Sequence, residues 1–289
     1  MRELGPNKKF DYWLRIVTLS LLQMACRKVP ISLPAFVILA FCCITFHNVF
    51  YKHKNSEQLK LAPIPQSLQP AVALKDQYLA IVRNAVAGLM YPSFEKGVLV
   101  ASFDGVDNIE RLPLNMTLRA TGLDWPLMGY TMIGLTRLDN IKLALETVIE
   151  QQIPGDFVEC GVWRGGASMY ATAVLNAWEA LSDRLVHVCD SFEGLPPPRT
   201  NKDMDYWSKM RYLRVSLEEV KSNFRALLLL HDSVHFHQGF FVDSLPKFPK
   251  RRSVAVLRMD GDMYESTMDI LFNLYEIVSI GGFIIIDDW

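Results

Sequence analysis

Short apolar runs separated by helical patterns fill the C-terminal half of the chain. Two of them, 253–259 and 282–286, are rich in β-branched residues and do not alternate with polar positions. Such runs are typical of strands that are buried on both faces of a parallel sheet. The predicted strands are 156–160, 185–189, 233–237, 253–259 and 282–286, with helices at 167–181, 216–230 and 263–280. This alternation predicts an α/β fold, a doubly wound Rossmann-like sheet.

The N-terminal half has a different pattern. Residues 31–50 contain no Asp, Glu, Lys or Arg over twenty positions, which is long enough for a transmembrane anchor. Residues 1–30 form a basic, amphipathic segment, and 51–73, with three prolines, are expected to be a stem or linker. The folded domain is expected to be 74–289. Within it, helices are predicted at 74–89 and 138–152, and the chain from about 90 to 130 is expected to be irregular.

The predicted anchor leads to a predicted localisation. More basic residues precede the span than follow it, which favours a cytoplasmic N-terminus. The sequence then describes a single-pass type II membrane protein with a lumenal catalytic domain, in the Golgi or endoplasmic reticulum. The sequon at Asn115 would be usable only on that side. A buried core helix at 31–50 is the open alternative.

Composition excludes few functions. The chain has 30 basic and 31 acidic residues, a net charge of −1, and no basic stripe, so no nucleic-acid partner is expected. Its five cysteines form no disulfide framework, and Cys160 and Cys189 are expected to be buried hydrophobes. His235 and His237 share a strand face, where packing is favoured over a zinc site. The formation of a homo-oligomer is left open.

Four acidic residues follow the last two predicted strands. Asp260 and Asp262 come after one strand, and Asp287 and Asp288 come after the next. Ligands of open α/β sheets bind beyond the carboxyl ends of strands, so these carboxylates are expected to share one crevice. Carboxylates this close repel one another unless a cation or a shared proton compensates them. Oxygen ligands of this kind suit Mg²⁺. The alternative is that they are ordinary loop acids.

A second candidate site follows the first two strands of the sheet. Gly161, Gly165 and Gly166 allow a tight turn, and Glu159 precedes it. Asp190 closes the next strand, where an acidic residue commonly binds ribose hydroxyls. These residues predict a cofactor that contains adenosine. A capping acid and a tight turn without a ligand is the alternative.

The motifs along 78–289 resemble the macrocin O-methyltransferase family, whose members are class I, S-adenosylmethionine-dependent and Mg²⁺-dependent sugar O-methyltransferases. The residues that carry the resemblance are Asp124-Trp-Pro126, Gly129-Tyr-Thr-Met-Ile-Gly134, Arg137-Leu-Asp-Asn140, Pro154-Gly-Asp-Phe-Val-Glu-Cys-Gly-Val-Trp-Arg-Gly-Gly166, Asp190-Ser-Phe-Glu-Gly-Leu-Pro196, Met259-Asp-Gly-Asp-Met-Tyr-Glu-Ser-Thr267, Gly281-Gly282 and Asp287-Asp288.

The resemblance also implies roles for single residues. By the resemblance, Asp262 is the general base, and Mg²⁺ is bound by Asp260, Asp287 and Asp288. The residues that it implies for S-adenosylmethionine are Thr131, Met132, Glu159, Gly161, Ser168, Asp190, Ser191, Phe192, Gly194, Gln238 and Gly239. The acceptor would be a hydroxyl of a small molecule or glycan, and the anchor favours a glycoconjugate.

The family's fold continues beyond a fifth strand into C-terminal strands that this sequence does not contain, so a truncated methyltransferase domain is expected. The leading hypothesis is a Mg²⁺-assisted O-methyltransferase with a membrane anchor. Two alternatives are a non-catalytic cofactor-fold binding protein and an inactive fragment. An NAD-linked oxidoreductase is disfavoured, because the glycine spacing is not that of a dinucleotide turn and hydride transfer needs no paired metal acids.

Overall fold

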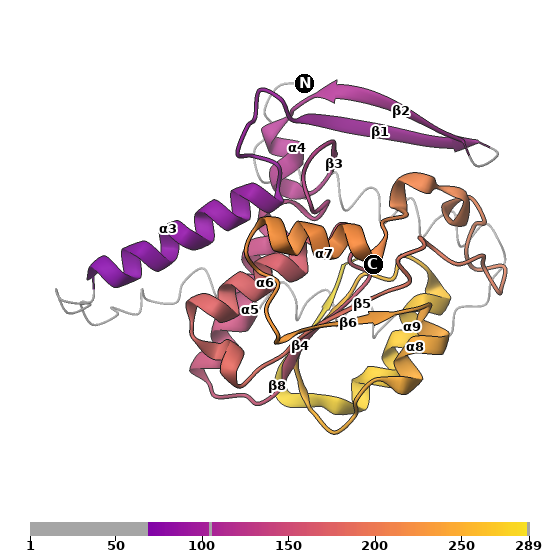
Figure 1. The fold of residues 1–289 in the computed structure, drawn as a ribbon. Helices are drawn as coiled ribbons and strands as arrows, with labels where there is room; N and C mark the ends of the chain where they lie inside the picture. The colour runs from indigo at the N-terminus through magenta and orange to yellow at the C-terminus, as the bar shows by residue number, and fades with distance from the viewer. Residues whose placement is uncertain (1–68, 104–105, 288–289) are drawn as a thin grey trace, which may run out of the picture. The chain divides into compact units, whose positions relative to one another are not determined.

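A five-stranded parallel sheet is the centre of the fold (Figure 1). The protein is described by a computed structural model that covers residues 69–103 and 106–287. The strand order is β6-β5-β4-β7-β8, which confirms the doubly wound α/β sheet. The strands are β4 (Asp156–Cys160), β5 (Val186–Asp190), β6 (Val234–Gln238), β7 (Val254–Met259) and β8 (Val278–Ile286).

Helices cover both faces of this sheet. On one face, α5, α6 and α7 bury apolar side chains against the strands, and α3 packs on α6. On the other face, α8 and α9 close a second apolar cluster over β4, β5 and β7. The helices are α3 (Gln69–Val86), α5 (Gly134–Glu150), α6 (Gly166–Ala177), α7 (Leu217–Ala226), α8 (Phe241–Ser244) and α9 (Tyr264–Leu274). Short 3₁₀ turns are η1 (Ala180–Ser182), η2 (Trp207–Lys209), η3 (Arg211–Leu213), η4 (Leu245–Lys247) and η5 (Tyr275–Ile277).

The strand predictions hold best where the sheet is fully covered. Every residue of β4 and β7 is buried. The prediction for the last strand is wrong in part, because β8 begins at Val278 and its residues are half-buried or exposed. It pairs with β7 alone in the described sheet, so only one side of it is covered by a neighbouring strand.

The prediction of an irregular chain from 90 to 130 is wrong. A three-stranded antiparallel sheet, ordered β2-β1-β3, forms there with the helix α4 (Met116–Thr121). Its strands are β1 (Lys96–Phe103), β2 (Val106–Pro113) and β3 (Trp125–Pro126). β2 mixes polar and apolar residues without strict alternation and is almost wholly exposed, so it lacks the pattern that reveals a buried strand.

The predicted membrane anchor at 31–50 lies outside the described residues, as do the basic segment 1–30 and most of the stem. In the part of the chain that the structure describes, no helix has both the length and the apolar character needed to cross a bilayer. The predicted type II membrane localisation is therefore corrected, since it finds no support in the described fold.

Candidate active site

One cavity of about 780 Å³ opens at the carboxyl ends of the strands β4, β5 and β7. Most of the predicted site residues line it, although they come from five separate stretches of chain. These are Thr131, Met132, Glu159, Gly161, Asp190, Ser191, Gly194, Asp260, Asp262 and Asp287. The predicted cofactor residues and the predicted acids are thus brought to one place.

The turn after β4 approaches its neighbour very closely. Gly161 has a φ of +89°, and a side chain there would place its Cβ 1.8 Å from the carbonyl oxygen of Asp260. Only glycine fits both the backbone conformation and this distance. The close approach puts the β4 turn directly beside the acid-bearing end of β7.

Asp190 ties two loops together at the end of β5. Its Oδ2 accepts a 2.7 Å hydrogen bond from the backbone N–H of Val162, and its Oδ1 accepts one of 2.7 Å from Phe192. Burial raises the pKa of the Asp190 carboxyl, while these backbone N–H groups act in the opposite direction. The Ser191 hydroxyl also donates to Oδ1 at 3.4 Å, and Asp190 lines the cavity.

Four predicted cofactor residues do not line the cavity. Ser168 is fully buried and donates a hydrogen bond to Glu159, so it can act only through that carboxylate. Phe192 belongs to the apolar core. Gln238 lies opposite Asp190 in the sheet, and Gly239 donates a 2.9 Å hydrogen bond to the Asp190 carbonyl. Their predicted contacts with a cofactor stay predictions.

A buried arginine gathers the acids at the ends of β4, β7 and β8. The Nη1 of Arg258 lies 2.6 Å from Glu159 and 2.8 Å from Asp260, and its Nη2 lies 2.7 Å from Asp287. Burial lowers the pKa of Arg258, but the three carboxylates outweigh it and raise that pKa. The guanidinium therefore supplies part of the compensating positive charge.

Sequence reasoning missed Arg258, although a signal was present. It is a charged residue within the otherwise apolar run 253–259, and charged side chains are rarely fully buried unless they are paired. Arg137 was quoted only as part of a motif, yet its Nη1 pairs with Oδ2 of Asp287. Its position on α5 gave no sign of that contact.

The described residues fit a divalent cation in part. Asp260 and Asp287 both line the cavity, and Oδ1 of Asp287 is buried 2.7 Å from Nη2 of Arg258. Burial raises the pKa of Asp287, as does the charge of Asp260, against the opposing effect of Arg258 and Arg137. Asp288 lies outside the described residues, and the described ones contain no cluster of three metal-binding side chains. Two of the three predicted ligands thus meet, and their role stays a prediction.

Aromatic residues that the sequence did not single out form another wall of the cavity. Trp125 stacks on Tyr212 with ring planes 2° apart, and the Tyr212 hydroxyl donates a 2.7 Å hydrogen bond to the carbonyl of Pro126. Trp125 and Trp207 both line the cavity. These rings are largely apolar, carry a polar N–H or O–H group and are held in place, so a flat organic acceptor can pack against them.

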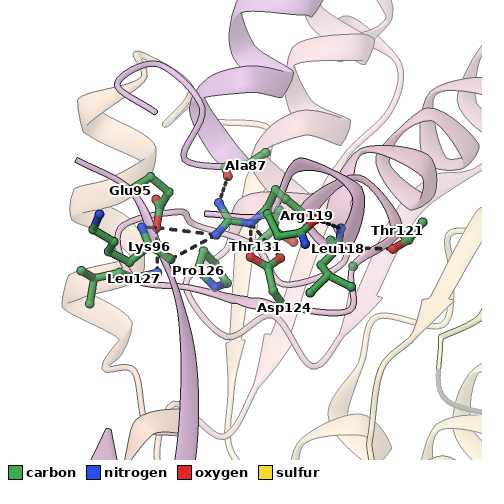
Figure 2. A network of polar contacts seen from close by, with 12 residues as sticks. Ala87, Glu95, Lys96, Leu118, Arg119, Thr121, Asp124, Pro126, Leu127 and Thr131 are labelled. Atoms are coloured by element: carbon green, nitrogen blue, oxygen red, sulfur yellow. Dashed lines mark hydrogen bonds and ion pairs between the residues drawn. The ribbon is translucent and has the colours of Figure 1, made fainter. Parts of the chain in front are cut away.

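A buried ion network supports this wall (Figure 2). Arg119 is 1% exposed and donates to Asp124 at 2.9 Å, to the Ala87 carbonyl at 2.7 Å and to the Lys96 carbonyl at 3.2 Å. Glu95 accepts hydrogen bonds from the backbone N–H groups of Leu127 and Met128. These contacts hold Asp124, Leu127 and Met128 in place, within the stretch of which Gly122, Trp125 and Thr131 line the cavity.

The two histidines predicted on one strand face do share it, because the rings of His235 and His237 lie 5.7 and 5.1 Å from the ring of His187 on the neighbouring strand. His237 lies 2.9 Å from His187, which in turn lies 3.2 Å from Asp156. His235 is exposed. The rings of His187 and His237 pack against Phe248, with centroids 4.8 and 5.0 Å apart. Cys160 and Cys189 are buried and in register on β4 and β5, as small apolar residues.

Comparisons with known proteins agree on one family. The family model described as macrocin-O-methyltransferase (TylF) matches residues 88–289. The chain is 41% identical over 234 residues to demethyldecarbamoylnovobiocin O-methyltransferase of Streptomyces niveus, covering 79% of this chain and 86% of that one. It is also 41% identical, over 220 residues, to the 8-demethyl-8-(2,3-dimethoxy-alpha-L-rhamnosyl)-tetracenomycin-C 4'-O-methyltransferase of Streptomyces olivaceus, covering 74% of this chain and 80% of the relative.

Structure comparison gives the same result. The solved structure of the O-methyltransferase NovP has a TM-score of 0.64 and 40% sequence identity, over 74% of this chain and 84% of that chain. The described chain thus has an α/β methyltransferase fold. The relatives are named as O-methyltransferases of Streptomyces species. No helix among residues 69–103 and 106–287 could span a membrane, and the predicted lumenal localisation is withdrawn.

Proposed function

The chain belongs to the macrocin O-methyltransferase family and is an O-methyltransferase, and on that premise we propose that it methylates a saccharide hydroxyl with S-adenosylmethionine and Mg²⁺. One observation carries the proposal. A single cavity joins the glycine turn and Asp190 on one side to Asp260, Asp262 and Asp287 on the other. A donor bound along β4 and β5 would therefore lie beside the acids that activate an acceptor.

The donor half of the site supplies position. Gly161 allows the donor to lie against the backbone of the β4 turn, and Asp190 would accept hydrogen bonds from ribose hydroxyls. Because the methyl group of a sulfonium is already activated, the protein's task is to align it with the acceptor oxygen. The rigid turns around Asp190 suit that task.

The acid half prepares the acceptor. Asp262 would take the proton of the acceptor hydroxyl, and among the described acids of the group it alone has a left-handed backbone, with a φ of +56°. Asp260 and Asp287 would hold Mg²⁺, together with Asp288 from beyond the described residues. When bound, Mg²⁺ would lower the pKa of the acceptor hydroxyl. Arg258 keeps Glu159, Asp260 and Asp287 in place.

The names of the relatives support a saccharide acceptor. One relative is named as the 4'-O-methyltransferase of a rhamnosyl-tetracenomycin, and another, from Micromonospora griseorubida, as mycinamicin III 3''-O-methyltransferase. The latter is 42% identical over 178 residues, covering 59% of this chain and 69% of the relative. Trp125 and Trp207 provide flat surfaces on which a sugar ring can stack.

The test is a transfer assay with methyl-labelled S-adenosylmethionine and a panel of glycosides, in Mg²⁺ and then in EDTA. We expect labelled glycoside only with Mg²⁺, and recovery when Mg²⁺ is added back. Calorimetry of S-adenosylmethionine binding gives a readout that is independent of turnover. Donor binding without transfer to any hydroxyl, or transfer that is indifferent to EDTA, contradicts the proposal.

A further inference from the structure

Arg137 lines the active-site cavity and has no role in the proposed reaction. It lies near the start of α5, and its side chain is 35% exposed. Its Nη1 is paired with Oδ2 of Asp287, one of the two described acids that would hold Mg²⁺. A positively charged side chain therefore lies where a cation is also expected to bind.

Both carboxylate oxygens of Asp287 are engaged by arginines. Its Oδ1 is buried and lies 2.7 Å from Nη2 of Arg258. Its Oδ2 accepts a hydrogen bond from Nη1 of Arg137. Because Oδ1 is closed off from solvent, a cation in the cavity would approach Asp287 on the side of Oδ2, which is the side that Arg137 holds.

The two arginines differ in how firmly they are held. Arg258 is 1% exposed and is also paired with Glu159 and Asp260, so moving it would leave further acids without their buried partner. Arg137 lies at the cavity wall, and Asp287 is its single ion-pair partner among the described residues. Arg137 is therefore the arginine that Asp287 can exchange for another cation.

Two backbone carbonyl groups keep Arg137 close to this acid. Its Nε donates a 2.8 Å hydrogen bond to the Ile133 carbonyl, and its Nη2 donates one of 3.0 Å to the Gly122 carbonyl. Neither contact involves Asp287, so both can persist when Nη1 gives up Oδ2. The guanidinium would then stay near a cation bound at Asp287, and like charges that lie close together repel each other.

We propose that Arg137 competes with Mg²⁺ for Oδ2 of Asp287 and thereby lowers the affinity of the metal site. The inference rests on the proposed function for the identity of the cation. A role in orienting Asp287 is the opposite reading, and it predicts that metal binding weakens by about 10–100-fold when Arg137 is removed. Competition predicts that metal binding becomes tighter, so the two readings differ in sign.

The experiment titrates the full chain with Mg²⁺ by calorimetry and with Mn²⁺ by electron paramagnetic resonance, since the same oxygen ligands suit both ions. We expect Arg137→Gln to bind each ion about tenfold more tightly than the wild type, because no charge-assisted hydrogen bond has to be broken. Arg137→Lys keeps the charge but loses the planar fork, so a smaller gain is expected.

The matched control is Arg83→Gln. It removes the ion pair between Arg83 and Asp139 of α5, and neither residue lines the cavity. The affinity for both ions should therefore equal that of the wild type. Thermal melting shows whether each variant is folded, and if the glutamine variant is not, the lysine variant decides in its place. A damaged fold would weaken metal binding, so a gain in affinity cannot come from structural damage.

Unchanged or weaker binding of both ions by a folded Arg137 variant overturns the inference. If the wild type itself binds neither ion, the proposed function and the inference fail together. If the wild type binds both ions and transfers methyl groups only with Mg²⁺, while the Arg137 variants show no gain, the inference fails and the proposed function stands.

Discussion

Glu159 and Arg258 face each other in register across β4 and β7, with Oε1 of Glu159 2.6 Å from Nη1 of Arg258. Both side chains are 1% exposed. Glu159 belongs to the predicted cofactor turn and Arg258 precedes the predicted metal acids, so this pair joins the two halves of the proposed site. Burial raises the pKa of Glu159 to about 7, against the opposing effect of Arg258.

Replacing Arg258 by Met should destabilise the fold by about 3–5 kcal/mol, because three carboxylates would lose their shared buried partner. Arg258→Lys should lower the free energy of unfolding by less, because lysine keeps the positive charge, although its single ammonium group cannot reach three carboxylates as the guanidinium does. The free energy of unfolding in urea measures both. The exposed Arg251→Met is the control, and a comparable loss there would remove the special role of Arg258.

Asp262→Asn should lower turnover by about 10²–10⁴-fold while leaving the affinity for S-adenosylmethionine nearly unchanged. Asparagine tolerates the left-handed backbone at this position, so the loop should keep its shape. Steady-state kinetics and donor calorimetry are the paired measurements, with the exposed Asp232→Asn as control. Unchanged turnover in the Asp262 variant would exclude it as the base.

Asp190→Ala should weaken donor binding by about tenfold or more, because the N–H groups of Val162 and Phe192 would lose their acceptor. The glycine turn and the following loop would then no longer be held together. Calorimetric titration with S-adenosylmethionine gives the affinity. Asp243→Ala, at an exposed position on α8, should bind the donor normally. Equal affinities in the two variants would show that Asp190 does not organise the donor site.

Stability should fall as pH drops from about 6.5 to about 4, in part because of His237. Burial, followed by the charges of His187 and His235, lowers the folded-state pKa of His237 to about 4. The unfolded chain therefore takes up a proton that the folded chain refuses, and stability present above pH 6.5 is lost on acidification. His237 is partly exposed, so we expect a contribution of about 1 kcal/mol.

Urea unfolding at pH 7 and pH 5 measures this contribution. Asp156 and Phe248 also lie in this network, and the pKa of Asp156 is lowered, against its burial, by hydrogen bonds from Arg252 and His187. Since Asp156 titrates below this window, the loss between pH 7 and 5 should shrink in His237→Gln and persist in His235→Gln. An identical pH profile in all three proteins would contradict the assignment.

The sequence predicts most where one local pattern decides the structure. The runs of β4, β5 and β7 are short and apolar, and their strands lie where the pattern places them, to within a residue at either end. The strand ends then bring Asp260 and Asp287 together without any further assumption, since Asp287 donates its N–H to the Met259 carbonyl. The parallel topology of β7 and β8 is therefore enough to predict that Asp260 and Asp287 lie close together.

What the sequence did not predict depends on distant contacts. The exposed strand β2 exists because it pairs with β1 along its whole length. Tyr212 reaches Trp125 and Pro126 across more than eighty residues, and no local spacing reveals such a contact. Arg258 carried a readable signal, but its three partners lie at the carboxyl ends of three different strands. Register and packing, rather than periodicity, decide these features.

The contact between Gly161 and the Asp260 carbonyl leaves no room for even one methyl group. In a saturation mutagenesis library selected for activity, codon 161 should therefore stay unchanged when neighbouring surface codons drift. Even alanine there would wedge the β4 turn away from β7 and separate donor from acceptor. Position 161 should thus be the least tolerant of substitution in this enzyme, although glycine has no side chain that could take part in the chemistry.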